Sequence, residues 1–271
     1  MEHGLQRIKD DFPLSLRMIK EMHEILLQKG RGAGKQPGEF RTSQNWIGGT
    51  RPGNAVYVPP PQEKVLDLLS DLEKFFRDEK GRLPSLIKAG LAHVQFESIH
   101  PFLDGNGRLG RLLVTFILCV DGILKEPLLF LSLYFKKNKK DYYVHLQHVR
   151  VTGDWEEWLK FFLQGVIETA NQAVQTVHDI LKLVENDRKK IEGVGRAAAS
   201  MLTVHHYLQK FPITDSKRIE ENCELTLPTV NSAFKQLLKL KIVEEKTGKA
   251  RNKIYVYTEY LKIMSDGIEP N

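Results

Sequence analysis

Apolar residues recur at intervals of three and four along most of this chain, which is the spacing of one face of an α-helix. Segments with such a stripe are 13–28, 63–78, 84–98, 109–120 and 142–149. Another helix begins at Trp155 and continues into the charged run 185–190. The pattern therefore predicts a mainly α-helical fold.

Two short segments depart from the helical spacing. Residues 45–47 and 55–58 read as strands on either side of a turn rich in glycine and proline. We expect a small β-hairpin within residues 44–60, whose strand edge can hydrogen-bond any extended segment. An ordinary surface hairpin is the alternative, because strand edges are common.

The last third of the chain reads as a separate module. It has three predicted helices, at 202–210, 216–222 and from Thr226 onward, followed by two strands around a basic turn. This order resembles a winged helix-turn-helix, whose third helix enters the major groove of DNA. Residues 226–253 carry seven Lys or Arg and two Glu, a net charge of +5, which suits a phosphate backbone. A module for protein contacts, or a spacer, is the alternative.

The charged run and the glycines that follow it mark the expected domain boundary. We place a helical domain at 1–192, a winged helix domain at 195–262 and a tail at 263–271.

Composition adds limits. Of 271 residues 41% are hydrophobic, which is enough for one large or two modest domains. The net charge of +6 is compatible with an anionic partner without requiring one. Two cysteines argue against a disulfide framework and favour a reducing compartment. The most apolar run, 112–124, is too short to span a bilayer, and no signal pattern precedes it, so we expect a cytoplasmic protein that does not bind a membrane.

The segment from His100 to Arg111 combines a base, a glycine-rich loop and two arginines. Because a helix begins directly after the loop, the glycines lie at a helix N-terminus. Unpaired N–H groups and the positive end of the helix dipole make an anion site there. Gly105 and Gly107 allow a phosphate to approach the backbone without interference from a Cβ atom.

The charged residues of this segment point to a polyphosphate. Arg108 and Arg111 fall in the first turn of the helix, where a cation is disfavoured by about 0.3–1 kcal/mol each, so we infer an anionic ligand that offsets this cost. Asp104 is sufficient to hold Mg²⁺, which commonly takes one carboxylate and fills its shell with phosphate oxygens and water. His100 can accept a proton near neutral pH.

The segment resembles the signature of the Fic family, His-Pro-Phe-x-Asp-Gly-Asn-Gly-Arg-x-x-Arg, at every fixed position. The resemblance implies a Fic-type helical domain that transfers AMP from ATP to a hydroxyl of a target protein and releases pyrophosphate. It implies that His100 deprotonates this hydroxyl, that Asp104 holds Mg²⁺, and that Arg108 and Arg111 bind the β- and γ-phosphates. The α- and β-phosphates would be held by the loop, Gly105, Asn106 and Gly107.

Two further parts follow from the same resemblance. The hairpin stands where the family has a flap that pins the main chain of the target, and the flap residues would be Ile47, Gly48, Gly49 and Thr50. The helix that begins near Tyr142 stands where the family lines its adenine pocket, so Tyr142 and Tyr143 would contact the nucleotide. Packing of these tyrosines in the core is an equally open alternative.

Other readings stay open. His93, Glu97 and His100 share one helical face and would make an alternative metal site, although their spacing is not that of zinc hydrolases. The protein would alternatively be a DNA-binding regulator whose Fic domain senses nucleotide. A third alternative is a transferase that uses another phosphate-containing donor, such as UTP or a choline nucleotide, because the loop would contact the phosphates and not the base. The expected partners are ATP, a hydroxyl-bearing target protein, DNA, and a second copy of the chain in a homodimer.

Many Fic proteins carry an inhibitory helix with the motif Ser/Thr-x-x-x-Glu-Gly/Asn, and we find no match to it. The first near-match ends in Glu192 and Gly193, but Arg188 stands at the position that requires Ser or Thr. The second runs from Ser216 to Glu220, but Glu221 follows where the motif requires Gly or Asn. The chain also begins close to the Fic core. We therefore expect a truncated form with deregulated activity, which an upstream segment or an antitoxin-like partner would suppress.

Overall fold

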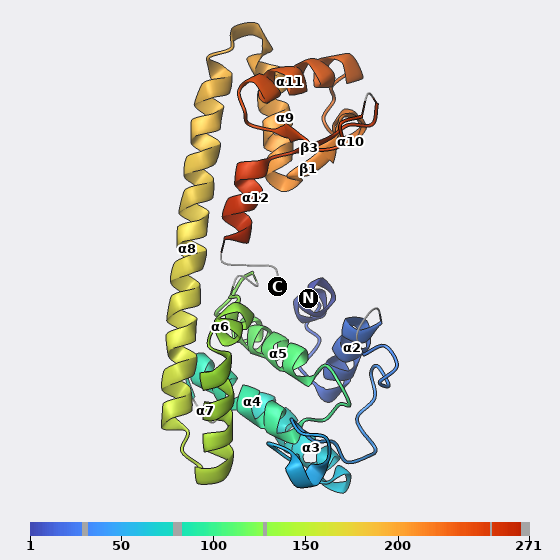
Figure 1. The fold of residues 1–271 in the computed structure, drawn as a ribbon, viewed down its shortest axis with the longest axis vertical. Coiled ribbons are helices and arrows are strands. Elements are labelled where there is room, and N and C mark those ends of the chain that lie inside the picture. The colour runs from blue at the N-terminus through green and yellow to red at the C-terminus, as the bar shows by residue number, and fades with distance from the viewer. Residues whose placement is uncertain (29–31, 78–82, 127–128, 250, 267–271) are drawn as a thin grey trace. The chain divides into compact units, whose positions relative to one another are not determined.

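The computed structural model covers residues 1–271, and the structure describes all of them except 29–31, 78–82, 127–128, 250 and 267–271. The chain divides into two compact units, residues 1–170 and 171–271. Each is described by itself (Figure 1).

The first unit is built from helices, and the helical segments expected from the sequence are confirmed. Its elements are α1 (Glu2–Lys9), α2 (Leu16–Leu27), η1 (Pro52–Asn54), α3 (Gln62–Arg77), α4 (Ser85–Ile99), α5 (Asn106–Val120), α6 (Leu131–Lys137), α7 (Lys139–Thr152) and the first part of α8 (Glu156–Glu192). Asp78, the last residue of the expected helix 63–78, lies outside the described residues. Helices α1 and α6 did not stand out in the sequence because they are short.

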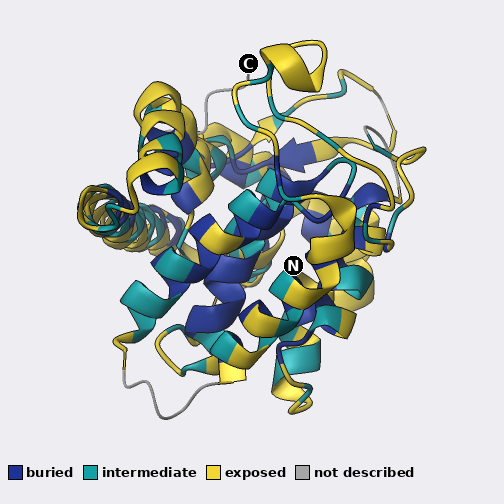
Figure 2. Cartoon of the chain, turned by 90° about the horizontal axis from the view of Figure 1, so that it is seen from below, coloured by how far each residue is buried: buried dark blue, intermediate teal, exposed yellow. Residues whose placement is uncertain are grey.

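The core of this unit is centred on α4 and α5, which pack against each other along their length. Figure 2 shows buried residues on the inner helices and exposed residues on the outer faces. Trp158, fully buried, donates from Nε1 to the carbonyl of Gly90 at 3.0 Å, so α8 packs closely on α4. A Cβ atom at position 90 would lie 3.1 Å from the ring of Phe162, which explains the glycine.

The expected hairpin is present only as one bridge. Ile47 pairs antiparallel with Tyr57, and its carbonyl accepts from the amides of Val56 and Tyr57 at 2.9 and 3.2 Å. The two strands predicted at 45–47 and 55–58 do not extend further. Gly49, with φ of +67°, turns so tightly that a Cβ atom there would lie 2.3 Å from the carbonyl oxygen of Asn54. This close approach diverts the chain before a second pair can form.

The second unit contains helices and a small sheet. Its elements after α8 are η2 (Gly195–Ala197), α9 (Ala198–Lys210), β1 (Ile213–Asp215), α10 (Ser216–Asn222), α11 (Leu227–Lys239), β2 (Glu244–Glu245), β3 (Ile254–Val256) and α12 (Thr258–Ser265). The sheet has the order β1-β3-β2 and is antiparallel throughout. The sequence predicted the three helices and a strand pair, although it placed the first of these strands at 242–243 and the structure has β2 at Glu244–Glu245. It did not predict β1, whose three residues pair with β3 some forty positions later.

The C-terminal part of α8 belongs to the second unit, although the sequence placed the boundary after residue 192. Leu183 and Ile191 pack in the second core. Asp187 is 2% exposed and accepts a hydrogen bond at 2.8 Å from the hydroxyl of Tyr257, which lies 3.1 Å from Nε2 of His205. The charged run at the predicted boundary therefore contains a buried, hydrogen-bonded residue, Asp187.

The expected tail begins inside a helix, because residues 263–265 form the end of α12, while 267–271 lie outside the described residues. Among the helices that the structure describes, none combines the length and the apolar character needed to cross a membrane.

Candidate active site

His100 ends α4 and has the left-handed backbone conformation, with φ of +49° and ψ of +59°. This conformation is strained for a residue with a Cβ atom, by about 1–2 kcal/mol. Two side chains hold it in place, because the His100 carbonyl accepts from Nε of Arg41 at 3.0 Å and from Nδ2 of Asn45 at 3.2 Å. The candidate base is thereby fixed at the point where the chain leaves α4.

Arg41 is the main support of this turn. Its side chain, only 3% exposed, also donates to the carbonyls of Ser43 and Pro60, and its backbone amide donates to the carbonyl of Pro101 at 2.8 Å. Burial lowers the pKa of the guanidinium from its usual value. The sequence did not single out Arg41 or Asn45 as site residues, because their partners are more than 50 positions away.

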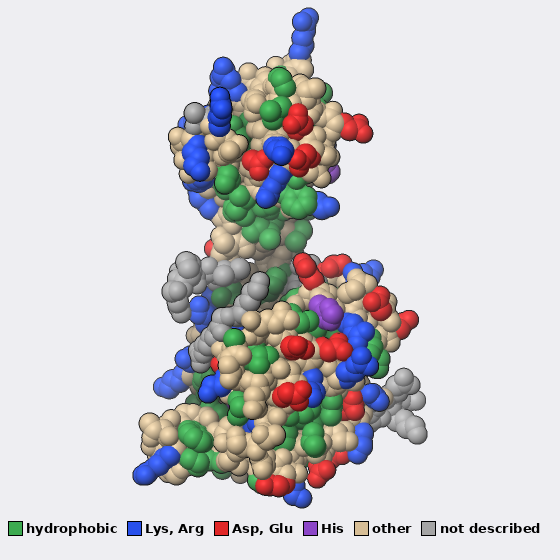
Figure 3. Space-filling model, turned by 90° about the vertical axis from the view of Figure 1, so that its right-hand side faces the viewer, with side chains coloured by type: hydrophobic (Ala, Val, Ile, Leu, Met, Phe, Trp, Pro, Cys, Tyr) green, Lys and Arg blue, Asp and Glu red, His purple; other side chains and the backbone are tan. Residues whose placement is uncertain are grey.

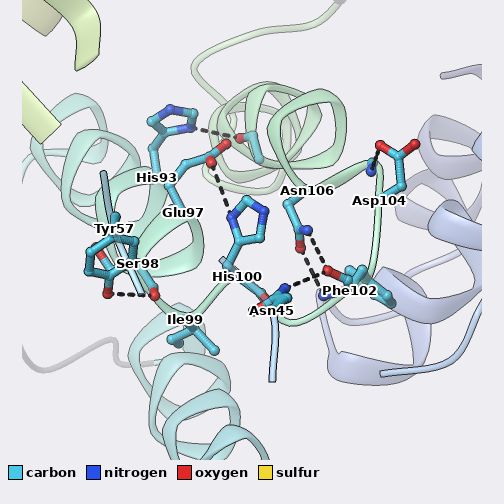
Figure 4. Close-up of polar contacts among 12 residues, drawn as sticks. Asn45, Tyr57, His93, Glu97, Ser98, Ile99, His100, Phe102, Asp104 and Asn106 are labelled. Carbon is cyan, nitrogen blue, oxygen red and sulfur yellow. Dashed lines mark hydrogen bonds and ion pairs between the residues drawn. The ribbon is translucent and has the colours of Figure 1, made fainter. Parts of the chain in front are cut away.

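The loop before α5 is closed by Asn106. Its side chain is 2% exposed, accepts from the amide of Phe102 at 2.9 Å and donates to the carbonyl of Phe102 at 2.7 Å. Gly105 has φ of +86°, which favours glycine, and Oδ1 of Asp104 accepts from its amide at 2.6 Å. Figure 4 shows these contacts beside His100.

His23, on α2, packs beneath the loop. Its ring stacks on Phe102 with 3.7 Å between centroids. Nδ1 accepts from the amide of Gly38 at 2.9 Å, so the ring proton is on Nε2, which donates to the carbonyl of Asp104 at 2.9 Å. Burial lowers the pKa of His23, which favours this neutral form. No local pattern predicts this role, because the contact joins positions 81 apart.

The first turn of α5 presents backbone amides and two arginines. The N-cap residue of this helix, Gly105, has no side chain that could cap it, and Leu109 donates from its amide to the carbonyl of Gly105 at 3.0 Å. Arg111 donates from Nε to Oγ of Ser132 at 3.2 Å. Nη2 of Arg108 lies 3.7 Å from Oδ1 of Asp104. The loop, both arginines and the carboxylate thus gather at one helix end.

His100 itself is 19% exposed at its side chain. Burial lowers its pKa to about 4, and the Glu97 backbone beside the ring partly opposes this. The imidazole is therefore neutral at pH 7 and able to accept a proton. Position and protonation state both suit a general base.

The alternative metal site at His93, Glu97 and His100 does not form. Both ring nitrogens of His93 are occupied, one by the carbonyl of Gly110 at 3.0 Å and the other by the hydroxyl of Tyr142 at 2.9 Å. Burial lowers the pKa of His93 to about 4. Within the described part of the chain, no group of three or more His, Cys, Asp or Glu side chains is arranged to hold a metal ion.

The two candidate adenine contacts differ in position. Tyr142 is 4% exposed, bonds to His93 and stacks on Phe135 with 4.7 Å between centroids, so it packs in the core. Tyr143 is 49% exposed. The packing alternative therefore describes Tyr142, and only Tyr143 is accessible to a ligand.

The flap is tied to the end of α4. Tyr57, which pairs with Ile47, donates from its hydroxyl to the carbonyl of Ser98 at 2.9 Å. Arg150, on α7, lies 3.9 Å above the Tyr57 ring, donates from Nε to Oγ of Ser98 and from Nη2 to the carbonyl of Glu97. The expected flap residues after the bridge, 48–50, are exposed.

Comparison with known proteins agrees with this arrangement. Residues 13–118 match the Fic/DOC family. The protein adenylyltransferase Fic of Aedes aegypti is 31% identical over 208 residues, which cover 70% of this chain and 38% of that protein. The protein adenylyltransferase fic-1 of Caenorhabditis briggsae is 30% identical over 154 residues, or 56% of this chain and 27% of that protein. This chain thus spans well under half the length of these curated relatives.

Solved structures show the same fold. A Fic family protein from Desulfovibrio desulfuricans G20 matches 94% of this chain and 72% of its own with a TM-score of 0.55 at 22% identity. Fic-1 of C. elegans matches 65% of this chain and 49% of its own with a TM-score of 0.51 at 24% identity. Residues 13–118 therefore resemble the Fic/DOC family in both sequence and fold.

Proposed function

We propose that this protein transfers AMP from ATP to a hydroxyl side chain of a target protein. The observation that carries the proposal is a neutral, fixed histidine beside a helix that begins at a glycine and bears two arginines near its start. Relatives named as protein adenylyltransferases support the same chemistry. In-line attack on a phosphate depends mainly on positioning and charge neutralisation, which this arrangement supplies.

The reaction uses the residues as follows. His100 takes the hydroxyl proton at Nε2 while the hydroxyl oxygen forms a bond to the α-phosphorus. The bond from that phosphorus to the bridging oxygen of the β-phosphate breaks, and pyrophosphate leaves with the electron pair. The backbone amide of Gly107 binds the phosphates, whereas that of Gly105 donates to Asp104. Arg108 and Arg111 bind the β- and γ-phosphates.

Asn106 contributes through its backbone, because both polar atoms of its side chain hold the loop. Of the two tyrosines we retain Tyr143 as the accessible adenine contact. The flap residues 47–50 would pair with the main chain of the target, since residues 48–50 are exposed at the edge of the bridge.

Asp104 is the residue that would hold Mg²⁺. Its Oδ1 accepts from the amide of Gly105, and a Cβ atom at Gly32 would lie 3.1 Å from Oδ2, so the carboxylate lies beside the loop that would bind the phosphates. One carboxylate is the usual protein share of a magnesium–nucleotide site. Bound Mg²⁺ would neutralise phosphate charge. Asp104→Ala should raise the Mg²⁺ concentration needed for half-maximal transfer.

The test of the main proposal is labelling of protein bands from α-labelled ATP with Mg²⁺ and a host lysate. His100→Ala should abolish labelling while nucleotide binding, measured by calorimetry, changes little. His148→Ala removes an exposed histidine of α7 and serves as the control. Unchanged labelling by His100→Ala would reject His100 as the base. Labelling only from UTP or another donor would favour the alternative substrate.

A second function is favoured by the second unit. We propose that it is a winged helix that binds duplex DNA, because helix α11 exposes Asn231, Lys235 and Lys239 while Phe234 is fully buried. Figure 3 shows Lys and Arg side chains gathered along one edge of this unit. Affinity for DNA should fall steeply with salt.

The matched pair for this test is Lys235→Glu, which should weaken DNA binding, and Lys64→Glu in the first unit, which should not. Equal affinity of both variants would reject α11 as the contact. DNA binding with no label transfer from ATP would favour the regulator over the enzyme.

A homodimer and a cytoplasmic location remain predictions. Both described cysteines, Cys119 and Cys223, are free.

A further inference from the structure

Glu97 is a buried carboxylate next to the candidate base that the proposed reaction leaves unused. It is 5% exposed and lies one helical turn before His100 on α4. A Cβ atom at Gly110 would lie 2.9 Å from its Oε1, and one at Gly107 would lie 3.5 Å away. The two glycines of α5 thus leave the space that this carboxylate fills.

The carboxylate faces the imidazole. Oε2 of Glu97 lies 3.9 Å from Nδ1 of His100, and Figure 4 shows the two groups directed at each other. Within the described residues, Nδ1 of His100 and Oε1 of Glu97 are buried without a hydrogen-bond partner. Buried polar atoms are rarely left unpaired. A shift of about 1 Å brings donor and acceptor to hydrogen-bond distance.

We propose that Glu97 is a positioning residue for His100: its carboxylate keeps the proton on Nδ1, directs Nε2 toward the target hydroxyl and stabilises the imidazolium formed during transfer. This inference rests on the proposed AMP transfer. The proton balance is unchanged, since the hydroxyl proton goes to Nε2 and the Nδ1 proton stays between the ring and Glu97. In this arrangement a carboxylate orients a histidine through Nδ1 while Nε2 accepts the proton, as in the Ser-His-Asp triad.

The protonation of Glu97 links this role to pH. Burial raises its pKa to about 7, and Arg111 on α5 and Arg150 on α7 act against this. Tyr142 on α7 and His93 on α4 also face the site. As pH falls through 7 the carboxylate becomes neutral and no longer stabilises a protonated ring. Turnover should therefore fall on the acid side near pH 7.

The test compares Glu97→Gln with Glu97→Asp and with Gln95→Ala, which alters the exposed side of the same helix. We expect Glu97→Gln to lower kcat by about a hundredfold, to leave KM for ATP within a few-fold, and to abolish the acid limb of the kcat profile. Glu97→Asp should recover part of kcat and keep the limb. Gln95→Ala should match the wild type.

Retention of the acid limb, or of wild-type kcat, by Glu97→Gln would overturn the inference. Nitrogen NMR of the His100 ring, assigned against His100→Asn, gives a readout that needs no activity and also serves if Glu97→Gln fails to fold. The wild-type ring should be in the Nδ1–H form. The Nε2–H form would overturn the inference whatever the activity. Absence of transfer by a wild type with the Nδ1–H form would instead count against the proposed function alone.

Discussion

Arg41→Lys removes the planar fork that holds the catalytic turn while it keeps the positive charge. In the wild type, three guanidinium nitrogens donate to four carbonyls, those of His100, Ser43 and Pro60 and, at 3.4 Å, that of Ile99. A lysine ammonium has no such fork and cannot reach three acceptors set around a plane. Two of the part-buried carbonyls lose this donor. At about 1–1.5 kcal/mol for each net bond, the first unit should lose about 2–3 kcal/mol.

Urea unfolding followed by tryptophan fluorescence measures this loss selectively, because all three tryptophans, at positions 46, 155 and 158, lie in the first unit. Arg77→Lys is the control, since the Arg77 side chain is 56% exposed and pairs with Glu73 on the same helix. That variant should change stability by less than about 0.5 kcal/mol. Arg41→Lys should also lower kcat, because His100 is no longer held in the left-handed conformation. A free energy of unfolding for Arg41→Lys equal to that of the control would refute this reasoning.

Three further outcomes are expected. Asn106→Ala removes both loop bonds of a buried side chain and should destabilise the first unit by about 2 kcal/mol and weaken ATP binding, measured by urea titration and calorimetry. Tyr257→Phe removes the hydroxyl that donates to the buried carboxylate of Asp187, which keeps Lys190 as a donor to its other oxygen, and should destabilise the second unit by about 1–3 kcal/mol, measured by hydrogen exchange. The free energy of unfolding of the first unit should decrease as pH falls from 6.5 to 4.5. In this range His93 and His100 are protonated in the unfolded chain but not in the folded one, whereas Glu97 is protonated in the folded chain only, which cancels one of the two protons. The net slope is about 1.4 kcal/mol per pH unit, and Glu97→Gln should roughly double it.

The helices and the phosphate loop were predictable because their signals are local. Residues 100–111 are contiguous, and the apolar stripe of α5 directly follows them in the sequence. Each needs only the short-range geometry of a helix and its N-terminus. The supports of the site carry no such signal. Arg41, Asn45 and His23 act on backbone atoms 55 to 81 positions away, and nothing near them marks that contact.

The hairpin and the domain boundary show how tertiary contacts override local patterns. The alternation at 45–58 is typical of strands, but the turn at Gly48 and Gly49 leaves room for one bridge. The charged run 185–190 suggested a solvated helix end. Asp187 is nevertheless buried, because the Tyr257 hydroxyl donates to it, and a partner seventy positions later cannot be read from the run itself.

Burial acts on His100 in two opposite ways, and this explains why a carboxylate beside it is useful. Lowering the pKa from 6.5 to about 4 keeps the ring neutral and able to accept a proton, but it makes the protonated ring costlier by about 3 kcal/mol. A carboxylate near 4 Å attracts that cation by about 4 kcal/mol at the effective dielectric of partly buried pairs, and Oε2 of Glu97 lies at 3.9 Å. The two effects are of similar size. The low pKa of His100 contains no contribution from the charge of the Glu97 side chain, so an ionised Glu97 would offset most of the cost of burial and bring the pKa of His100 back toward its ordinary value.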